Sequence, residues 1–108
     1  MGVSSMTQKE LYEQLKAIGF PVAYYSFSEE QTAPYLVYLF SYSNDLVADN
    51  INYHEVSNFQ IELYTYNKDL TSEKAVEDKL KEINLPYRKL ETYIEDEKVY
   101  QITYLVTI

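Results

Sequence analysis

The stretch Asn58-Phe-Gln-Ile-Glu-Leu-Tyr-Thr-Tyr66 decides the fold, because its side chains alternate in character from one residue to the next. On an extended backbone one side carries Phe59, Ile61, Leu63 and Thr65, and the other carries Asn58, Gln60, Glu62 and Tyr64. An alternation of period two is typical of a β-strand with one buried face and one wetter face. The stretch lies in the middle of the chain, so we predict that it is the central strand of a sheet.

Two strand-like segments precede this central strand. The first is the short apolar run Val22-Ala23-Tyr24-Tyr25, within residues 20–27. The second, residues 35–42, is apolar on both faces, which favours a strand that is covered on both sides. The polar residues 28–34 contain a proline and are predicted to connect the two strands.

Two more strands are predicted after it, over residues 90–94 and 99–108. The charged residues Glu95-Asp96-Glu97-Lys98 lie between them and are expected to form a solvated turn. On the last strand, one face would carry Tyr100, Ile102, Tyr104, Val106 and Ile108.

A helix is predicted over residues 6–18. In Thr7-Gln8-Lys9-Glu10, the side chains of Thr7 and Glu10 can satisfy each other's free amide donors as a capping box. Gly19 is placed to end the helix in a left-handed turn, and Pro21 prevents its continuation. A hydrophobic staple and an apolar stripe are formed by Met6, Leu11, Leu15 and Ile18.

A second helix is predicted to begin near Thr71 or Ser72, either of which can act as its cap, and to end near Asn84 before Pro86. The turn between the central strand and this helix is expected at Asn67-Lys68-Asp69. Its apolar stripe consists of Val76, Leu80 and Ile83. Its solvent-facing side is predicted to carry Glu73, Lys74, Glu77, Asp78, Lys81 and Glu82.

These segments give the order helix, strand, strand, strand, helix, strand, strand. The order predicts an α+β fold in which two helices pack on a mostly antiparallel, mixed sheet of four to five strands. The length of 108 residues fits one domain over 1–108. Residues 1–5 are expected to be disordered.

Composition excludes several classes of function. The net charge of -8 argues against a nucleic-acid groove, which needs clustered Lys and Arg. There is no Cys, so disulfides and thiolate chemistry are absent. No apolar run approaches the roughly 20 residues of a membrane span, and residues 1–5 lack the features of a signal peptide. We therefore expect no membrane partner and a cytoplasmic location.

Residues 43–53 interrupt the strand pattern and form a polar segment that is either a mobile loop or the extended tip of a hairpin. The apolar side chains of Leu46, Val47 and Ile51 either find a partner protein or fold back on their own sheet. The interface residues predicted here are Asn44, Asp45, Leu46, Val47, Asp49, Asn50, Ile51 and Tyr53.

The sequence offers no catalytic constellation. His54 is the only histidine, and a base or metal ligand would need convergent partners. Asp45 and Asp49 lack the other ligands and the glycine of a calcium loop. We predict no catalytic, cofactor-binding or metal site, and do not expect an enzyme. The chain has 13 Tyr and no Trp, a composition that suits either half-buried strands or a protein interface.

Four segments carry a family resemblance: Leu15-Lys-Ala-Ile-Gly-Phe-Pro-Val-Ala-Tyr24, Pro34-Tyr-Leu-Val-Tyr38, Phe59-Gln-Ile-Glu-Leu-Tyr64 and Leu90-Glu-Thr-Tyr-Ile94. Together they resemble a group of small prophage proteins of low-GC Gram-positive bacteria. That group is similar to the tail-terminator, or tail-to-head joining (tail completion), proteins of long-tailed phages. The resemblance runs through nearly the whole chain from Met6 onward. It implies a fold with a long β-hairpin between the second and third strands.

The resemblance also implies a function. Tail terminators form a ring, generally a hexamer, that caps the tail tube protein and presents a surface to the head-tail connector protein. Ring closure through a heterologous interface would fix the copy number and stop polymerisation. Residues 43–53 would become ordered on assembly, and DNA would only pass through as cargo. The acidic excess would suit a channel wall that repels DNA, or is ordinary solubility charge.

Two other classes stay open. One is a small cytoplasmic regulatory or ligand-binding module, whose mark would be a deep apolar pocket with a few polar groups. The other is an inhibitor-like prophage protein that binds a host enzyme through a tyrosine-rich face.

Overall fold

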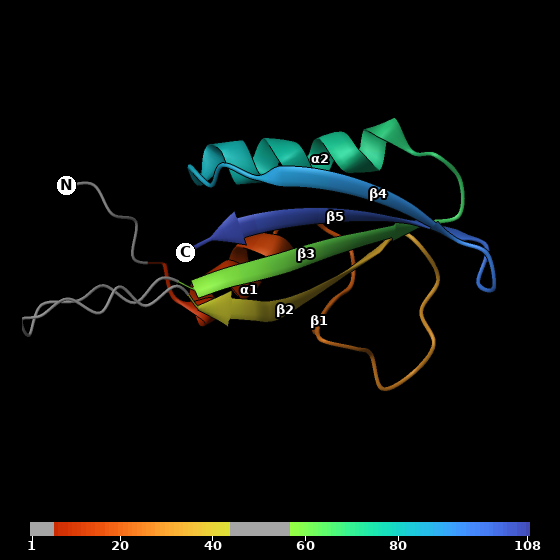
Figure 1. Ribbon diagram of the computed structural model, residues 1–108, viewed down its shortest axis with the longest axis horizontal. Coiled ribbons are helices and arrows are strands. Elements are labelled where there is room, and N and C mark those ends of the chain that lie inside the picture. The colour runs from red at the N-terminus through yellow and green to blue at the C-terminus, as the bar shows by residue number, and fades with distance from the viewer. Residues whose placement is uncertain (1–5, 44–56) are drawn as a thin grey trace, which may run out of the picture.

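A computed structural model describes residues 6–43 and 57–108 of the chain (Figure 1). The predicted order of elements is confirmed over this part of the chain. The predictions for residues 1–5 and for residues 44–53 of the predicted loop or hairpin tip lie outside the described residues. The elements are α1 (Gln8–Lys16), β1 (Val22–Tyr24), β2 (Tyr35–Ser43), β3 (Ser57–Thr65), α2 (Leu70–Glu82), β4 (Arg88–Ile94) and β5 (Val99–Thr107).

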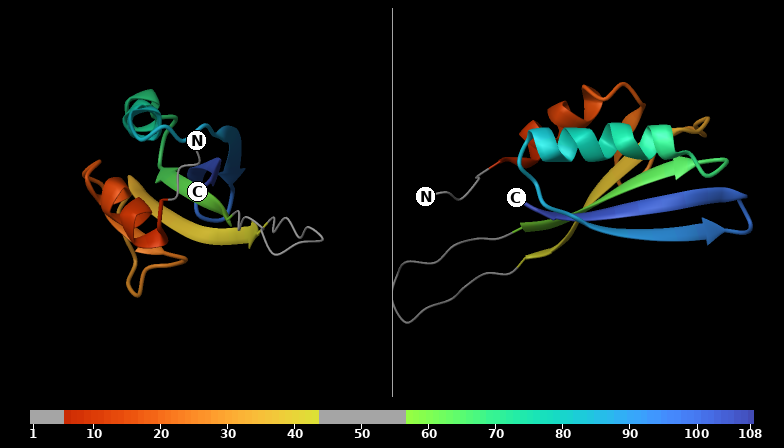
Figure 2. Two further views of the ribbon diagram at one scale, coloured as in Figure 1. Left: turned by 90° about the vertical axis from the view of Figure 1, so that its left-hand side faces the viewer. Right: turned by 90° about the horizontal axis from the view of Figure 1, so that it is seen from above.

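The described strands form one mixed sheet in the order β1-β2-β3-β5-β4. The prediction that residues 58–66 form the central strand is therefore confirmed. β1 pairs with β2 in parallel, and the other neighbouring pairs are antiparallel. Both helices lie on the same side of the sheet, and among the described residues no helix lies on the other side, here called the open face (Figure 2).

The hydrophobic core lies between the sheet and the two helices. The β3 side chains alternate between buried and half-buried, as the sequence pattern predicts. The buried set on β3 is Phe59, Ile61, Leu63 and Thr65. The three apolar members belong to one cluster with Leu11 and Leu15 of α1 and with Val76 and Leu80 of α2. Both helices are thus held to the sheet through the apolar stripes that their sequences predict.

The prediction that β2 is covered on both faces is correct only for its first half. Leu36, Val37 and Tyr38 are buried, whereas Phe40 and Tyr42 are 43% and 55% exposed. The pairing of β2 with β3 shifts register between Phe40 and Tyr42. In Figure 2 the twist of the sheet carries this end of β2 away from the helices. Neither of the two described helices therefore covers the aromatic side chains at this end.

The start of α1 is the predicted capping box. The Thr7 backbone N–H donates to Glu10 Oε1 at 2.8 Å, and the Glu10 backbone N–H donates to Thr7 Oγ1 at 3.1 Å. The helix ends at Lys16, two residues earlier than predicted. Gly19 has a φ of 114°, a left-handed conformation that glycine adopts without steric cost. Its predicted role in turning the chain is confirmed.

The prediction that Thr71 or Ser72 caps α2 is wrong, because the cap is Asp69. The Asp69 carboxylate accepts from the Ser72 backbone N–H at 3.0 Å and from the Ser72 hydroxyl at 2.7 Å. These hydrogen bonds, the hydroxyl one first, lower the pKa of Asp69 below its ordinary value of 3.8. The helix ends at Glu82.

We expect that Asp69→Ala lowers the free energy of unfolding by about 1 kcal/mol, the usual cost of removing an N-cap acceptor. Chemical denaturation monitored by circular dichroism measures this change. The matched control is Thr71→Ala, which removes the exposed cap proposed from sequence and should leave stability unchanged. A loss of stability in the control, with none in Asp69→Ala, would contradict the observed cap.

The prediction that Glu73 faces solvent is also wrong, because its side chain is only 2% exposed. Lys68 Nζ and Lys89 Nζ each lie 2.7 Å from a Glu73 oxygen, and Lys89 Nζ also lies 2.6 Å from Glu77 Oε2. The Tyr104 hydroxyl donates to the same Glu77 oxygen at 2.8 Å. The ion pairs of Lys89 tie α2 to β4, and the hydrogen bond of Tyr104 ties it to β5. The two lysines compensate for burying the Glu73 carboxylate. The helical period alone could not predict this, because the lysines come from outside the helix.

Candidate functional site

Polar side chains run along the open face of the sheet, on the side of β3 that no helix covers. Glu62 accepts from Gln60 Nε2 at 3.1 Å and from the Tyr64 hydroxyl at 2.8 Å. The Tyr64 hydroxyl in turn accepts from Gln101 Nε2 of β5 at 2.8 Å. The wetter face predicted from the alternation is therefore an ordered hydrogen-bonded row along the centre of the sheet.

Tyr64 is held in its neutral form by this arrangement. Burial first, and then the hydrogen bond to Glu62, raise the pKa of Tyr64 well above its ordinary value of 10.0. Its phenol donates to Glu62 and accepts from Gln101, so both hydrogen bonds are made within the sheet. Tyr64 is thus a fixed aromatic surface.

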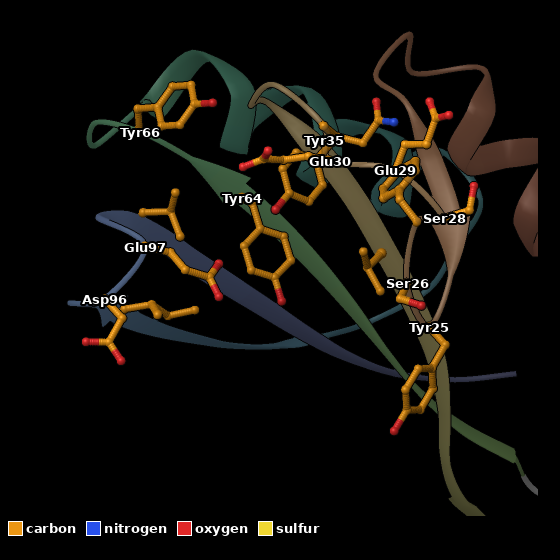
Figure 3. Close-up of a pocket in the computed structure, with 15 residues that line it drawn as sticks. Tyr25, Ser26, Ser28, Glu29, Glu30, Tyr35, Tyr64, Tyr66, Asp96 and Glu97 are labelled. Atoms are coloured by element: carbon orange, nitrogen blue, oxygen red, sulfur yellow. The ribbon is translucent and has the colours of Figure 1, made fainter.

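A groove of about 790 Å³ opens on this face, where β2 begins and β3 ends (Figure 3). Its floor includes Tyr35 and Val37 of β2, Tyr64 of β3 and Val99 of β5. Residues 25–31, which follow β1, form one wall, and Ile94, Asp96 and Glu97 form another. Segments far apart in the sequence thus build one concave surface.

The aromatic rings of the floor support one another. Tyr35 and Tyr64 are directly paired across β2 and β3, and their rings stack with centroids 4.9 Å apart. Phe27 packs edge-on against Tyr35 at 5.4 Å. Such pairs are favourable beyond the area they bury, so the rings stabilise one another's positions on the floor.

The charges around the groove have one sign. Glu29 and Glu30 come from the loop after β1, and Asp96 and Glu97 come from the turn between β4 and β5. Among the described residues that line the groove, none is Lys, Arg or His. Figure 3 shows Glu30 and Glu97 directed towards the tyrosine rings from two sides, whereas Asp96 points outward.

The pKa of Tyr35 reports the same convergence of charge. Burial is the largest cause and raises this pKa above its ordinary value of 10.0. The negative charge of Glu97 raises the pKa further, and Tyr66 and then Glu30 have smaller effects in the same direction. The two carboxylates come from different walls yet act on one phenol. The groove therefore presents aromatic rings within a negative field.

The sequence-based prediction located the candidate interface elsewhere. All eight residues proposed within 44–53 lie outside the described residues, as does His54, so that proposal stays a prediction. The residues that sequence reasoning missed are Tyr35, Tyr64, Glu30 and Glu97. A signal was present for Tyr64, which the alternation places on the face opposite the core. The turn at 95–98 was expected only to be solvated, yet two of its residues line the groove.

Over residues 6–43 and 57–108, no group of three or more His, Cys, Asp or Glu side chains is arranged to hold a metal ion. No helix in this part of the chain is both long and apolar enough to cross a membrane.

No protein-family model matches the sequence, and no curated protein is similar to it in sequence. Among solved structures, the chain is similar to one from the virion of a native gene transfer agent (GTA) particle. The alignment covers 90% of this chain and 88% of that chain, with a TM-score of 0.59 and 16% identity. At this identity the similarity shows a shared fold.

Proposed function

We propose that this protein is a structural component of a phage or prophage virion, and that it acts by binding rather than by turnover. The observation that carries the proposal is the fold shared, over nearly the full length of both chains, with a chain of a gene transfer agent virion. The segments that resemble tail-completion proteins support it independently, because they come from the sequence alone.

The finer proposal is that the protein is a tail terminator. It would assemble in the cytoplasm as a ring, through one heterologous contact repeated until the ring closes at about six copies. The ring would cap the tail tube, contact the head-tail connector and remain in the virion at that junction. The open sheet face offers a preformed surface for such contacts, since its floor is ordered by aromatic pairs and hydrogen bonds.

A small-molecule module is the competing function, and the groove bears on it. Ligand pockets are mostly apolar, with a few convergent polar groups. The groove instead has four carboxylates in its lining, of which those of Glu30 and Glu97 are directed towards the tyrosines, and it is open along the sheet. This composition fits contact with another protein better than enclosure of a metabolite.

Tube capping has a distinctive stoichiometry, which provides the test. A phage tail-tube protein would be assembled into tubes of two mean lengths, and bound protein would be quantified after sedimentation. A terminator should saturate at a fixed number of copies per tube end, whatever the tube length. Binding that grows with tube length, or no binding to tubes at all, would refute the proposal.

Native mass spectrometry of the protein alone, over a wide concentration range, supplies the companion measurement. A single closed oligomer without larger species would support ring closure. An open series of ever larger oligomers would contradict a closing interface.

A further inference from the structure

We propose that the groove on the open sheet face binds an extended, arginine-containing segment of a partner protein. Its floor is the Tyr35–Tyr64 pair, and its charged walls are Glu29 and Glu30 on one side and Asp96 and Glu97 on the other. The inference goes beyond the proposed function, because it requires neither ring closure nor a place in a virion.

Charge complementarity identifies the occupant. The described lining of the groove has carboxylates but no cation, so these charges lack an internal partner within it. The carboxylates on the opposite, helix-covered face behave differently, since Glu73 and Glu77 are each paired with lysine at 2.6–2.7 Å. A guanidinium entering between Glu30 and Glu97 would supply the missing charge and could form forked hydrogen bonds with a carboxylate.

The aromatic floor favours arginine over a simple point charge. A guanidinium plane stacks on tyrosine rings and is more weakly hydrated than an ammonium group. The rings of Tyr35 and Tyr64 are stacked on each other 4.9 Å apart, and the Tyr64 phenol is fixed by Glu62 and Gln101. The surface therefore needs little reordering when a cation arrives, which reduces the entropic cost of binding.

The shape of the groove favours an extended segment. Its volume of about 790 Å³ is spread between two walls, and Val37 and Val99 supply apolar area on the floor. A strand-like segment in which basic and apolar side chains alternate could place cations against the walls and apolar groups on the floor. A nucleic-acid backbone would be repelled, because its phosphates would face the carboxylates of Glu30 and Glu97.

The test uses a blocked peptide of alternating arginine and valine as the probe, with the glutamate–valine peptide as its counterpart. Binding is followed on the isotopically labelled full-length protein by NMR. We expect the arginine peptide to shift the signals of Tyr35, Tyr64 and Glu97, and the affinity to fall when the ionic strength is raised. The glutamate peptide should cause no shifts at these residues.

Charge reversal of the walls supplies the decisive comparison. Glu30→Lys combined with Glu97→Lys should weaken binding of the arginine peptide at least about tenfold. The matched control is Glu82→Lys combined with Glu95→Lys, which makes the same change in net charge at exposed residues that do not line the groove. Thermal unfolding of each variant verifies that it is folded, and the milder Glu30→Gln with Glu97→Gln replaces any variant that is not.

The inference is overturned by any of three results. The arginine peptide could leave the groove signals unshifted, the two double reversals could weaken binding equally, or the glutamate peptide could bind as well. Each result leaves the tube-capping measurement unaffected, so failure of this inference is distinguishable from failure of the proposed function.

Discussion

Ile61→Ala should lower the free energy of unfolding by about 2–5 kcal/mol, the range observed when a large buried aliphatic side chain is truncated. Ile61 is fully buried at the middle of β3 and is paired with Tyr38 on β2 and Tyr104 on β5. These neighbours are anchored in rigid strands, so they cannot collapse into the space that the mutation leaves. Such a loss is a large fraction of the total stability of an ordinary domain, about 5–15 kcal/mol.

The measurement is urea denaturation, with Gln60→Ala as the matched control on the adjacent residue of β3. Gln60 lies on the open face, where its removal costs hydrogen bonds to Ser41 and Glu62 but creates no cavity. We expect the control to lose about 1 kcal/mol or less. Equal losses in the two variants would contradict the assignment of one buried and one open face to β3.

Glu73→Gln should lower the free energy of unfolding by about 1–3 kcal/mol, because it removes the charge from two short ion-paired contacts while keeping the size of the side chain. The carboxylate is buried, but Lys68 and Lys89 are 40% and 37% exposed. Solvent therefore screens the lysines, and each keeps a second partner, Glu91 or Glu77. This is why we expect a smaller loss than for a fully buried pair.

Asp78→Asn is the control for Glu73→Gln, because it also neutralises one carboxylate of α2. Asp78 pairs with Lys74 at 2.8 Å, but both side chains are more than half exposed. An exposed pair of this kind contributes little, and we expect no measurable change. If Asp78→Asn destabilised the protein as much as Glu73→Gln does, the buried network would not be what ties α2 to the sheet.

The sequence predicted most of the fold because local patterns record local geometry. The alternation in β3, the capping box at Thr7 and the left-handed turn at Gly19 are each set by neighbouring residues, and each is confirmed. The wrong predictions for Glu73 and Phe40 concern burial, which depends on residues far away in the sequence. The burial of Glu73 depends on Lys89 of β4, and the exposure of Phe40 depends on how far the helices reach over the sheet.

The groove could be predicted only in part. Alternation places Tyr64 away from the core, but its stacking on Tyr35 depends on the register between β2 and β3. The approach of Glu30 to Glu97 depends on the order of strands, since 66 positions separate them in the chain. Sequence spacing says nothing about residues so far apart. It therefore could not predict that both carboxylates raise the pKa of the Tyr35 phenol.

The position of β5 between β3 and β4 has a consequence for the kinetics of folding. Within the described sheet, β4 pairs only with β5, so β4 is joined to the central strand only through β5. The contacts between β3 and β5 join segments about 40 residues apart. The entropic cost of closing that loop therefore arises before the strand pairing can stabilise the sheet. Assembly of this half of the domain should be concerted, with β4 and β5 docking together as a hairpin and α2 settling over them in the same step.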